Sequence, residues 1–156
     1  PTELSGEMAD RLRESGQEYG ASTGRARRCG WYDAVVVRYS ARINGLDALA
    51  LTKLDVLDGL PEVQICVGYD TPTGRLTEFP ADLRALTHAT PVYETLPGWT
   101  TPTKGVTRFE QLPLEAQRYV KKLEEVSGVE CAIISTGSDR SETIVRPDSR
   151  VAAWFS

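Results

Sequence analysis

Two short polar segments, each following an apolar run, carry residue types suited to recognising a purine base. They are Thr52-Lys53-Leu54-Asp55 and, later in the chain, Ser135-Thr136-Gly137. A carboxylate such as Asp55 can accept both the N1–H and the N2–H of guanine, a donor pair that adenine lacks. The stem of Lys53 can lie along the base while its ammonium reaches a loop carbonyl or a ribose oxygen.

Backbone N–H groups of the second segment can donate to the guanine O6, and Gly137 permits a close approach. Taken alone, the first segment fits a solvated strand-to-turn connection equally well. The presence of a second polar segment after another buried run favours a base pocket, because ligands of open α/β sheets collect beyond the carboxyl ends of strands.

A third segment concentrates positive charge within an otherwise acidic protein. Arg25, Arg27 and Arg28 fall within four residues and follow Ser22-Thr23-Gly24. Guanidinium groups hold carboxylates and phosphates in bidentate pairs, so this loop suits capture of a small anionic substrate, over which it could close. The alternative is that these arginines only pair with surface carboxylates.

Composition narrows the class of protein. The 156 residues suit one domain or a substantial piece of a larger one, and a net charge of -4 argues against a nucleic-acid-binding domain. No apolar run approaches the length of a membrane span. Cys29, Cys66 and Cys131 show no paired spacing, which disfavours a disulfide framework or a zinc site and fits the cytoplasm.

The elements that must position these segments follow from periodicity and from helix and strand signals. Four-residue apolar spacing predicts a helix from residue 4 to before Gly16 or Gly20 and another from Trp31 to Asn44-Gly45. A third helix is predicted to open at Pro113 and to end at Ser127-Gly128. Residues 19–30 are predicted to form a loop. Strands are predicted over residues 46–51, 63–67, 91–96, 130–135 and 143–145. This alternation indicates an α/β fold, and the strand count indicates one end of a larger sheet.

Five motifs, in order along the chain, resemble the adenylosuccinate synthetase family. They are Glu18-Tyr19-Gly20-Ala21-Ser22-Thr23-Gly24-Arg25-Ala26-Arg27-Arg28-Cys29-Gly30-Trp31, Leu51-Thr52-Lys53-Leu54-Asp55-Val56-Leu57-Asp58-Gly59-Leu60, Ile65-Cys66-Val67-Gly68-Tyr69, Tyr93-Glu94-Thr95-Leu96-Pro97-Gly98-Trp99 and Ile134-Ser135-Thr136-Gly137-Ser138-Asp139-Arg140. The resemblance implies GTP-dependent, magnesium-assisted ligation of IMP and L-aspartate to adenylosuccinate in purine synthesis. It also implies a P-loop-NTPase-like fold with a mostly parallel sheet and flanking helices, and a cytoplasmic homodimer.

The resemblance also implies roles for individual residues. Thr23 and Arg25 would contact the aspartate carboxylates, Arg25 would also reach IMP, and Arg27 would lie between aspartate and GTP. The implied aspartate and IMP loop is Ala21, Ser22, Thr23, Gly24, Arg25, Ala26 and Arg27. The implied GTP contacts are Arg27, Lys53, Leu54, Asp55, Ser135, Thr136 and Gly137.

Departures from the family pattern are mild within these motifs and large outside them. Ser22 stands where the family more often has Thr, and Ala26 where it has a basic residue or Pro. Ser138 stands where the family usually has Pro. The family's glycine-rich phosphate loop, catalytic Asp, catalytic His and magnesium ligands have no counterpart in this chain. Its one histidine, His88, matches no catalytic motif.

We therefore expect the carboxyl-terminal third of such an enzyme, inactive alone and without catalytic residues of its own. A chain that begins at Pro1 rather than at Met agrees with that expectation. The alternative is a stand-alone module that binds guanine nucleotides or a protein partner.

Overall fold

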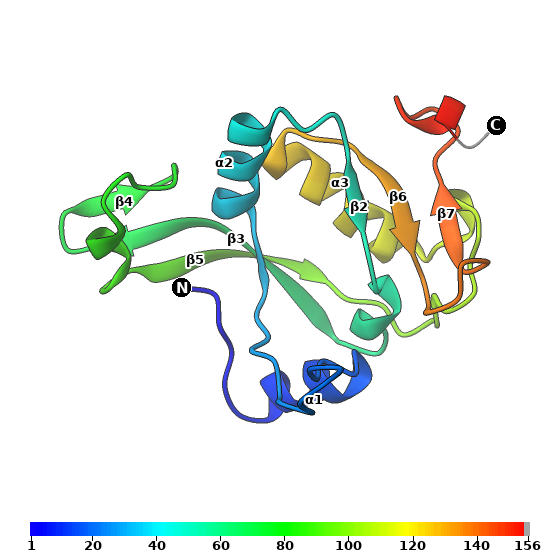
Figure 1. Cartoon of the computed structure of the whole chain (residues 1–156), viewed down its shortest axis with the longest axis horizontal. Coiled ribbons are helices and arrows are strands. Elements are labelled where there is room, and N and C mark those ends of the chain that lie inside the picture. The colour runs from blue at the N-terminus through cyan, green and yellow to red at the C-terminus, as the bar shows by residue number, and fades with distance from the viewer. Residues whose placement is uncertain (155–156) are drawn as a thin grey trace.

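The computed structural model describes residues 1–154, and Figure 1 shows how its helices and strands are arranged. The helices are α1 (Glu7–Ser15), α2 (Ala34–Asn44) and α3 (Leu114–Ser127), with short 3-10 helices η1 (Leu54–Leu57), η2 (Leu83–Leu86), η3 (Phe109–Gln111) and η4 (Ala152–Trp154). The strands are β1 (Tyr32–Asp33), β2 (Leu49–Leu51), β3 (Glu62–Thr71), β4 (Gly74–Leu76), β5 (Thr90–Pro97), β6 (Cys131–Ser135) and β7 (Thr143–Val145).

The strands form two mixed sheets. In the first, β3 pairs in parallel with β1 and antiparallel with β4 and β5. In the second, β6 pairs in parallel with β2 and antiparallel with β7. Helix α3 contacts β3 and β5 of the first sheet and β6 of the second, and it also packs on α2.

The prediction of a mostly parallel sheet is therefore wrong for the part of the chain that the structure describes. The short connections explain the difference. A two-residue link between β3 and β4, and a seven-residue link between β6 and β7, are too short for the crossover that parallel neighbours need. The broader prediction of an α/β fold is confirmed.

The predicted signals for helix ends are confirmed at α2 and α3. Gly45 and Gly128 cap the two carboxyl ends with φ of 59° and 71°, in the left-handed region that glycine adopts without strain. Helix α2 starts later than predicted, because Tyr32 and Asp33 pair with β3 first. The Oδ1 of Asp33 then caps the helix by accepting from Val35 N at 3.1 Å and Val36 N at 3.2 Å.

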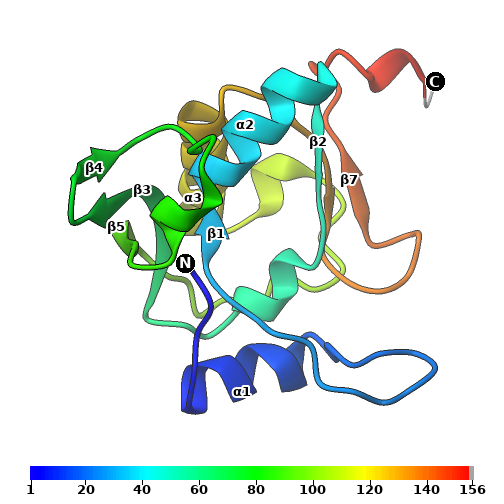
Figure 2. The same cartoon turned by 60° about the vertical axis from the view of Figure 1, so that its left-hand side comes forward.

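One hydrophobic core joins the two sheets through α3. Its fully buried members include Leu60 before β3, Val63 of β3, Val120 and Leu123 of α3, and Ile134 of β6. Helix α1 lies at the opposite end of the molecule from α2, and the long segment that follows it extends beside it (Figure 2). That segment contains residues 19–30, which form a loop as predicted.

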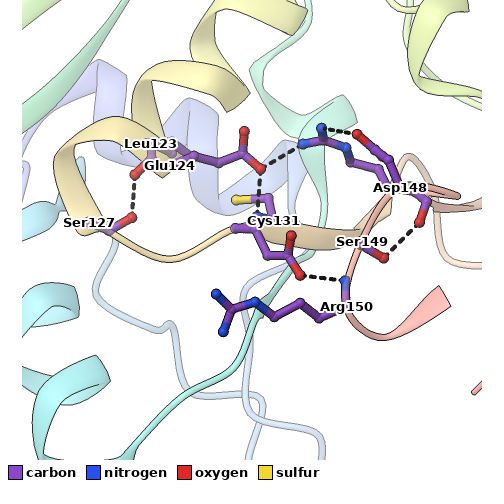
Figure 3. A network of polar contacts seen from close by, with 9 residues as sticks. Leu123, Glu124, Ser127, Cys131, Asp148, Ser149 and Arg150 are labelled. Atoms are coloured by element: carbon purple, nitrogen blue, oxygen red, sulfur yellow. Dashed lines mark hydrogen bonds and ion pairs between the residues drawn. The ribbon is translucent and has the colours of Figure 1, made fainter. Parts of the chain in front are cut away.

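A polar network holds residues 146–150 against α3 and the start of β6 (Figure 3). Glu124 of α3 accepts hydrogen bonds from Cys131 N at 2.8 Å and from the Arg146 guanidinium at 2.6 Å. Arg150 N donates to the carboxylate of Glu130 at 2.7 Å. These contacts hold the start of β6, whose other end carries the predicted base-binding segment.

Candidate functional site

The two predicted base-binding segments lie side by side because the strands that precede them are neighbours. Leu51 of β2 is paired with Ile134 of β6 in parallel register, so both strands end at the same edge of the sheet. Beyond that edge, Lys53 N donates to Ser135 Oγ at 2.8 Å. The structure thus brings together residues more than eighty positions apart in the sequence.

These segments line a cleft of about 600 Å³. Its walls are Ser15, Gly16, Gln17, Thr52, Lys53, Asp55, Val56, Lys104, Ser135, Gly137 and Ser138. Four of these residues lie outside the predicted motifs: Ser15, Gly16 and Gln17 at the end of α1, and Lys104 in the loop after Trp99. A cleft of this size accommodates a small organic ligand.

Asp55 is the carboxylate of this cleft. Its Oδ1 is buried and has no hydrogen-bond partner within residues 1–154. Burial raises the pKa of Asp55, and the nearby carboxylates of Asp58 and Glu142 raise it further, while Lys104 opposes them. Because an unpartnered buried carboxylate oxygen is costly, this atom favours a ligand that donates hydrogen bonds.

Lys53 separates this cleft from a second one. Its backbone has φ of 59°, unusual for a residue other than glycine, at the start of η1. Its Nζ donates to Gly16 O at 2.6 Å and to Glu18 Oε1 at 2.5 Å. The ammonium therefore reaches a loop carbonyl, one of the two partners that the sequence suggested.

The arginine loop is a hairpin-like turn. Gly20 N donates to Arg25 O at 2.8 Å, and Arg27 N donates to Glu18 O at 2.9 Å. Gly24 closes the tip with φ of 64°. Its Thr23 Oγ1 accepts from Arg25 N at 3.3 Å.

The three arginines have different surroundings. Arg27 pairs with Glu18 at 3.0 Å and Arg28 with Glu3 at 3.3 Å, as the surface-pairing alternative predicted. Arg25 is exposed, and its guanidinium makes no hydrogen bond or ion pair within the described residues. Arg25 is therefore the cation of this loop that stands open to a ligand.

A second cleft of about 410 Å³ lies on the arginine side of Lys53. Glu18, Arg27 and Arg28 line it together with Trp31 and Tyr119. The two clefts share four lining residues, which are Gly16, Thr52, Lys53 and Val56. The predicted anion loop and the predicted base pocket are thus adjacent.

Comparison with known proteins decides the family. The family model described as Adenylosuccinate synthetase matches residues 1–144 of the chain. The chain belongs to the adenylosuccinate synthetase family.

Individual members of the family show the same relationship. The chain is 51% identical over 148 residues to the adenylosuccinate synthetase of Desulforamulus reducens, covering 95% of this chain and 35% of that protein. It is 52% identical over 145 residues to the adenylosuccinate synthetase of Saccharophagus degradans, covering 93% of this chain and 34% of that protein. The fully ligated adenylosuccinate synthetase of Plasmodium falciparum superposes with a TM-score of 0.87 at 38% identity, covering 92% of this chain and 35% of that one. The chain therefore spans about a third of the length of these family members.

Not every residue implied by the family resemblance has its side chain in the base cleft. Leu54 is 1% exposed and belongs to the core, as its apolar side chain requires. Thr136 is fully buried, and its Oγ1 donates to Val106 O at 2.9 Å. Gly137 does line the cleft, and a Cβ added at this position would meet the Glu142 carboxylate.

Thr136 contributes indirectly, by holding the turn that carries Lys104. Val106 is fixed by Thr136, and at the other end of the turn Thr103 N and Oγ1 donate to the Asp58 carboxylate at 2.7 Å and 2.8 Å. Trp99 Nε1 donates to the same carboxylate at 2.6 Å. This clamp sets one wall of the cleft. No sequence signal predicted it, because its partners are distant in the chain.

Within residues 1–154, no group of three or more His, Cys, Asp or Glu side chains could hold a metal ion. Among the same residues, no helix is long and apolar enough to cross a membrane.

Proposed function

We propose that this chain forms the carboxyl-terminal third of an adenylosuccinate synthetase, which ligates IMP and L-aspartate with GTP and magnesium. In this proposal the enzyme is a cytoplasmic homodimer, and its catalytic residues and magnesium ligands lie outside these residues. The chain supplies the base pocket for GTP and the loop for aspartate and IMP, and is inactive alone. The observation that carries the proposal is the buried, unpartnered Oδ1 of Asp55 in a cleft lined by both predicted segments.

Guanine recognition follows from the donors and acceptors around that cleft. Asp55 accepts from N1–H and N2–H of the base, and adenine is rejected because it would leave the carboxylate unpaired. Lys53 is held by Gly16 O and Glu18, so its stem forms a fixed wall of the cleft. In this proposal, backbone N–H groups around Ser135 and Gly137 donate to the base oxygen, except Thr136 N, which donates to Glu142 O at 2.9 Å. Leu54 and Thr136 act through packing, Leu54 in the core and Thr136 through Val106.

The arginine loop orients the second substrate. In the proposed reaction the GTP γ-phosphoryl group is transferred to O6 of IMP, and the aspartate amine then displaces inorganic phosphate at C6. Thr23 and Arg25 hold the aspartate carboxylates so that the amine points at the purine, and Arg25 also contacts IMP. Arg27 lies between aspartate and GTP. Catalysis of this kind rests on positioning and charge neutralisation.

Arg25→Leu in the full-length enzyme tests this assignment. The variant should raise the KM for aspartate about 100-fold, since a charge-assisted pair to a carboxylate is lost, and leave the KM for GTP within about twofold. Arg84→Leu is the matched control, because Arg84 is exposed and its guanidinium pairs, within residues 1–154, with Asp82 alone. An unchanged KM for aspartate in Arg25→Leu would remove the loop from the aspartate site.

Calorimetry of the 156-residue chain with GDP, ADP and XDP tests the base pocket separately. We expect GDP to bind more weakly than to the full-length enzyme and ADP not to bind. Tight GDP binding by the chain alone, together with no adenylosuccinate formation by the full-length protein, would instead favour a guanine-nucleotide-binding module.

A further inference from the structure

Glu18 is the residue through which the arginine loop and the base cleft contact each other. Its Oε1 accepts from Lys53 Nζ at 2.5 Å, and its Oε2 accepts from Arg27 Nη1 at 3.0 Å. Each carboxylate oxygen is thus used by a cation from a different segment. The family motif contains Glu18, but the roles proposed above leave it without one.

The backbone fixes where the Glu18 carboxylate stands. Glu18 N donates to Arg13 O at 2.8 Å, and Glu18 O accepts from Arg27 N at 2.9 Å. Arg13 Nε also donates to Arg27 O at 3.1 Å. The carboxylate is therefore attached to the end of α1 and to the base of the arginine loop at once.

The charge and exposure of Glu18 suit a residue that positions two cations more than one that stabilises the fold. The side chain of Glu18 is 25% exposed, against 45% for Lys53 and 57% for Arg27. The Lys53 ammonium, and after it the Arg27 guanidinium, hold the pKa of Glu18 below its ordinary value, so the link is ionised at neutral pH. Ion pairs this exposed add little to the stability of the fold. Their geometric effect remains, because one carboxylate sets the place of two cations.

We infer that Glu18 is a positioning residue that couples the arginine loop to the nucleotide cleft. This inference rests on the proposed function for the identity of the two ligands. A guanine nucleotide that fixes Lys53 also fixes Glu18, and Glu18 then holds Arg27 with its remaining N–H groups free for a ligand. By linkage, a ligand on the arginine loop favours the nucleotide by the same factor.

Trypsin measures this coupling directly, because it cleaves after the arginines of the exposed loop. In the full-length protein, GDP should slow cleavage at residues 25–28 about fivefold, the upper end of the effect expected from an exposed ion pair. In Glu18→Gln the unliganded loop should be cleaved faster, and GDP should slow cleavage by less than about twofold. Glu14→Gln is the matched control. It removes the same charge from α1, and the Glu14 side chain is exposed and makes no hydrogen bond within the described residues.

Steady-state kinetics supply a second measurement. In Glu18→Gln the KM values for GTP and for aspartate should both rise about fivefold, while kcat and the melting temperature stay close to those of Glu14→Gln. If Glu18 had a purely structural role, Glu18→Gln would lower the melting temperature and leave both KM values unchanged. That result would overturn the inference. A rise in the KM for GTP alone would also overturn it, since Glu18 would then act on Lys53 only.

The failure of the inference and the failure of the proposed function give different results. If wild-type protein neither binds GDP nor forms adenylosuccinate, the proposed function is refuted. The trypsin cleavage rates without ligand still test whether Glu18 positions the arginine loop. Equal rates in Glu18→Gln and Glu14→Gln would show that Glu18 does not position the loop. If the wild-type protein is active but GDP protects both variants equally, the coupling is refuted and the proposed function stands.

Discussion

Removal of the Asp58 carboxylate should be among the most damaging single changes to this fold. Asp58 accepts hydrogen bonds from Trp99 Nε1, Thr103 N and Thr103 Oγ1 at 2.6, 2.7 and 2.8 Å. Asp58→Ala leaves these donors unpaired, two of them on Thr103, whose side chain is fully buried. An unpaired buried donor costs about 1–3 kcal/mol, and Asp58 itself is half-buried, so we expect a total loss of about 3–4 kcal/mol.

Urea unfolding of three variants separates this clamp from a general effect of charge. Thr103→Val keeps the shape and the N–H bond but loses the hydroxyl bond, so it should cost about 1 kcal/mol. Asp47→Ala removes an exposed carboxylate and should cost less than about 0.5 kcal/mol. A loss below about 1 kcal/mol in Asp58→Ala, or an equal loss in Thr103→Val, would refute the clamp.

Three further predictions concern the cleft and the thiols. Because burial raises the pKa of Asp55 above its ordinary 3.8, the unliganded protein should lose stability as pH rises from 3.8 through the raised pKa. The affinity for GDP should fall as pH drops through the same pKa, because the carboxylate is then protonated. Asp55→Asn should flatten both pH profiles, and unchanged profiles would contradict the assignment. Gly137→Ala places a Cβ against Glu142 Oε2, which accepts from Asp139 N at 3.0 Å, so the carboxylate must move and urea unfolding should show a loss of about 1 kcal/mol. The loss on Gly137→Ala should be smaller in a Glu142→Ala background, and an equal loss there would implicate the backbone instead. Iodoacetamide followed by mass spectrometry should find Cys29 modified in the native protein and Cys131 protected, because Cys131 is buried and burial raises its pKa to about 12; equal rates would contradict its burial.

Local signals predicted those parts of the fold that depend on neighbouring residues. Gly45, Pro113 and Gly128 mark helix ends because they act within one turn of backbone. The strand at residues 143–145 was predicted with the bounds that the structure gives it. The length of β3 was not predicted, because the strand continues past Gly68 to Thr71 only where β4 and β5 pair with it.

The site divides in the same way. The nearness of Lys53 and Ser135 was predictable, because each was expected at the carboxyl end of an apolar strand in an α/β sheet. Lys104 and Gln17 could not be placed, since each reaches the cleft from a loop whose position depends on distant contacts. The family motif includes Glu18 but gave it no role, and its two partners are visible only in the folded chain.

The nucleotide preference of Asp55→Asn in the full-length enzyme tests the central claim most directly. Xanthine has a carbonyl where guanine has its amino group, so an asparagine amide can donate to it. We predict that GDP affinity falls about 100-fold and that XDP binds more tightly than it does to the wild-type protein. Asp139→Asn, an exposed change outside the cleft lining, should leave both affinities unchanged. Unaltered GDP affinity in Asp55→Asn, or no gain for XDP, would contradict guanine recognition by this cleft.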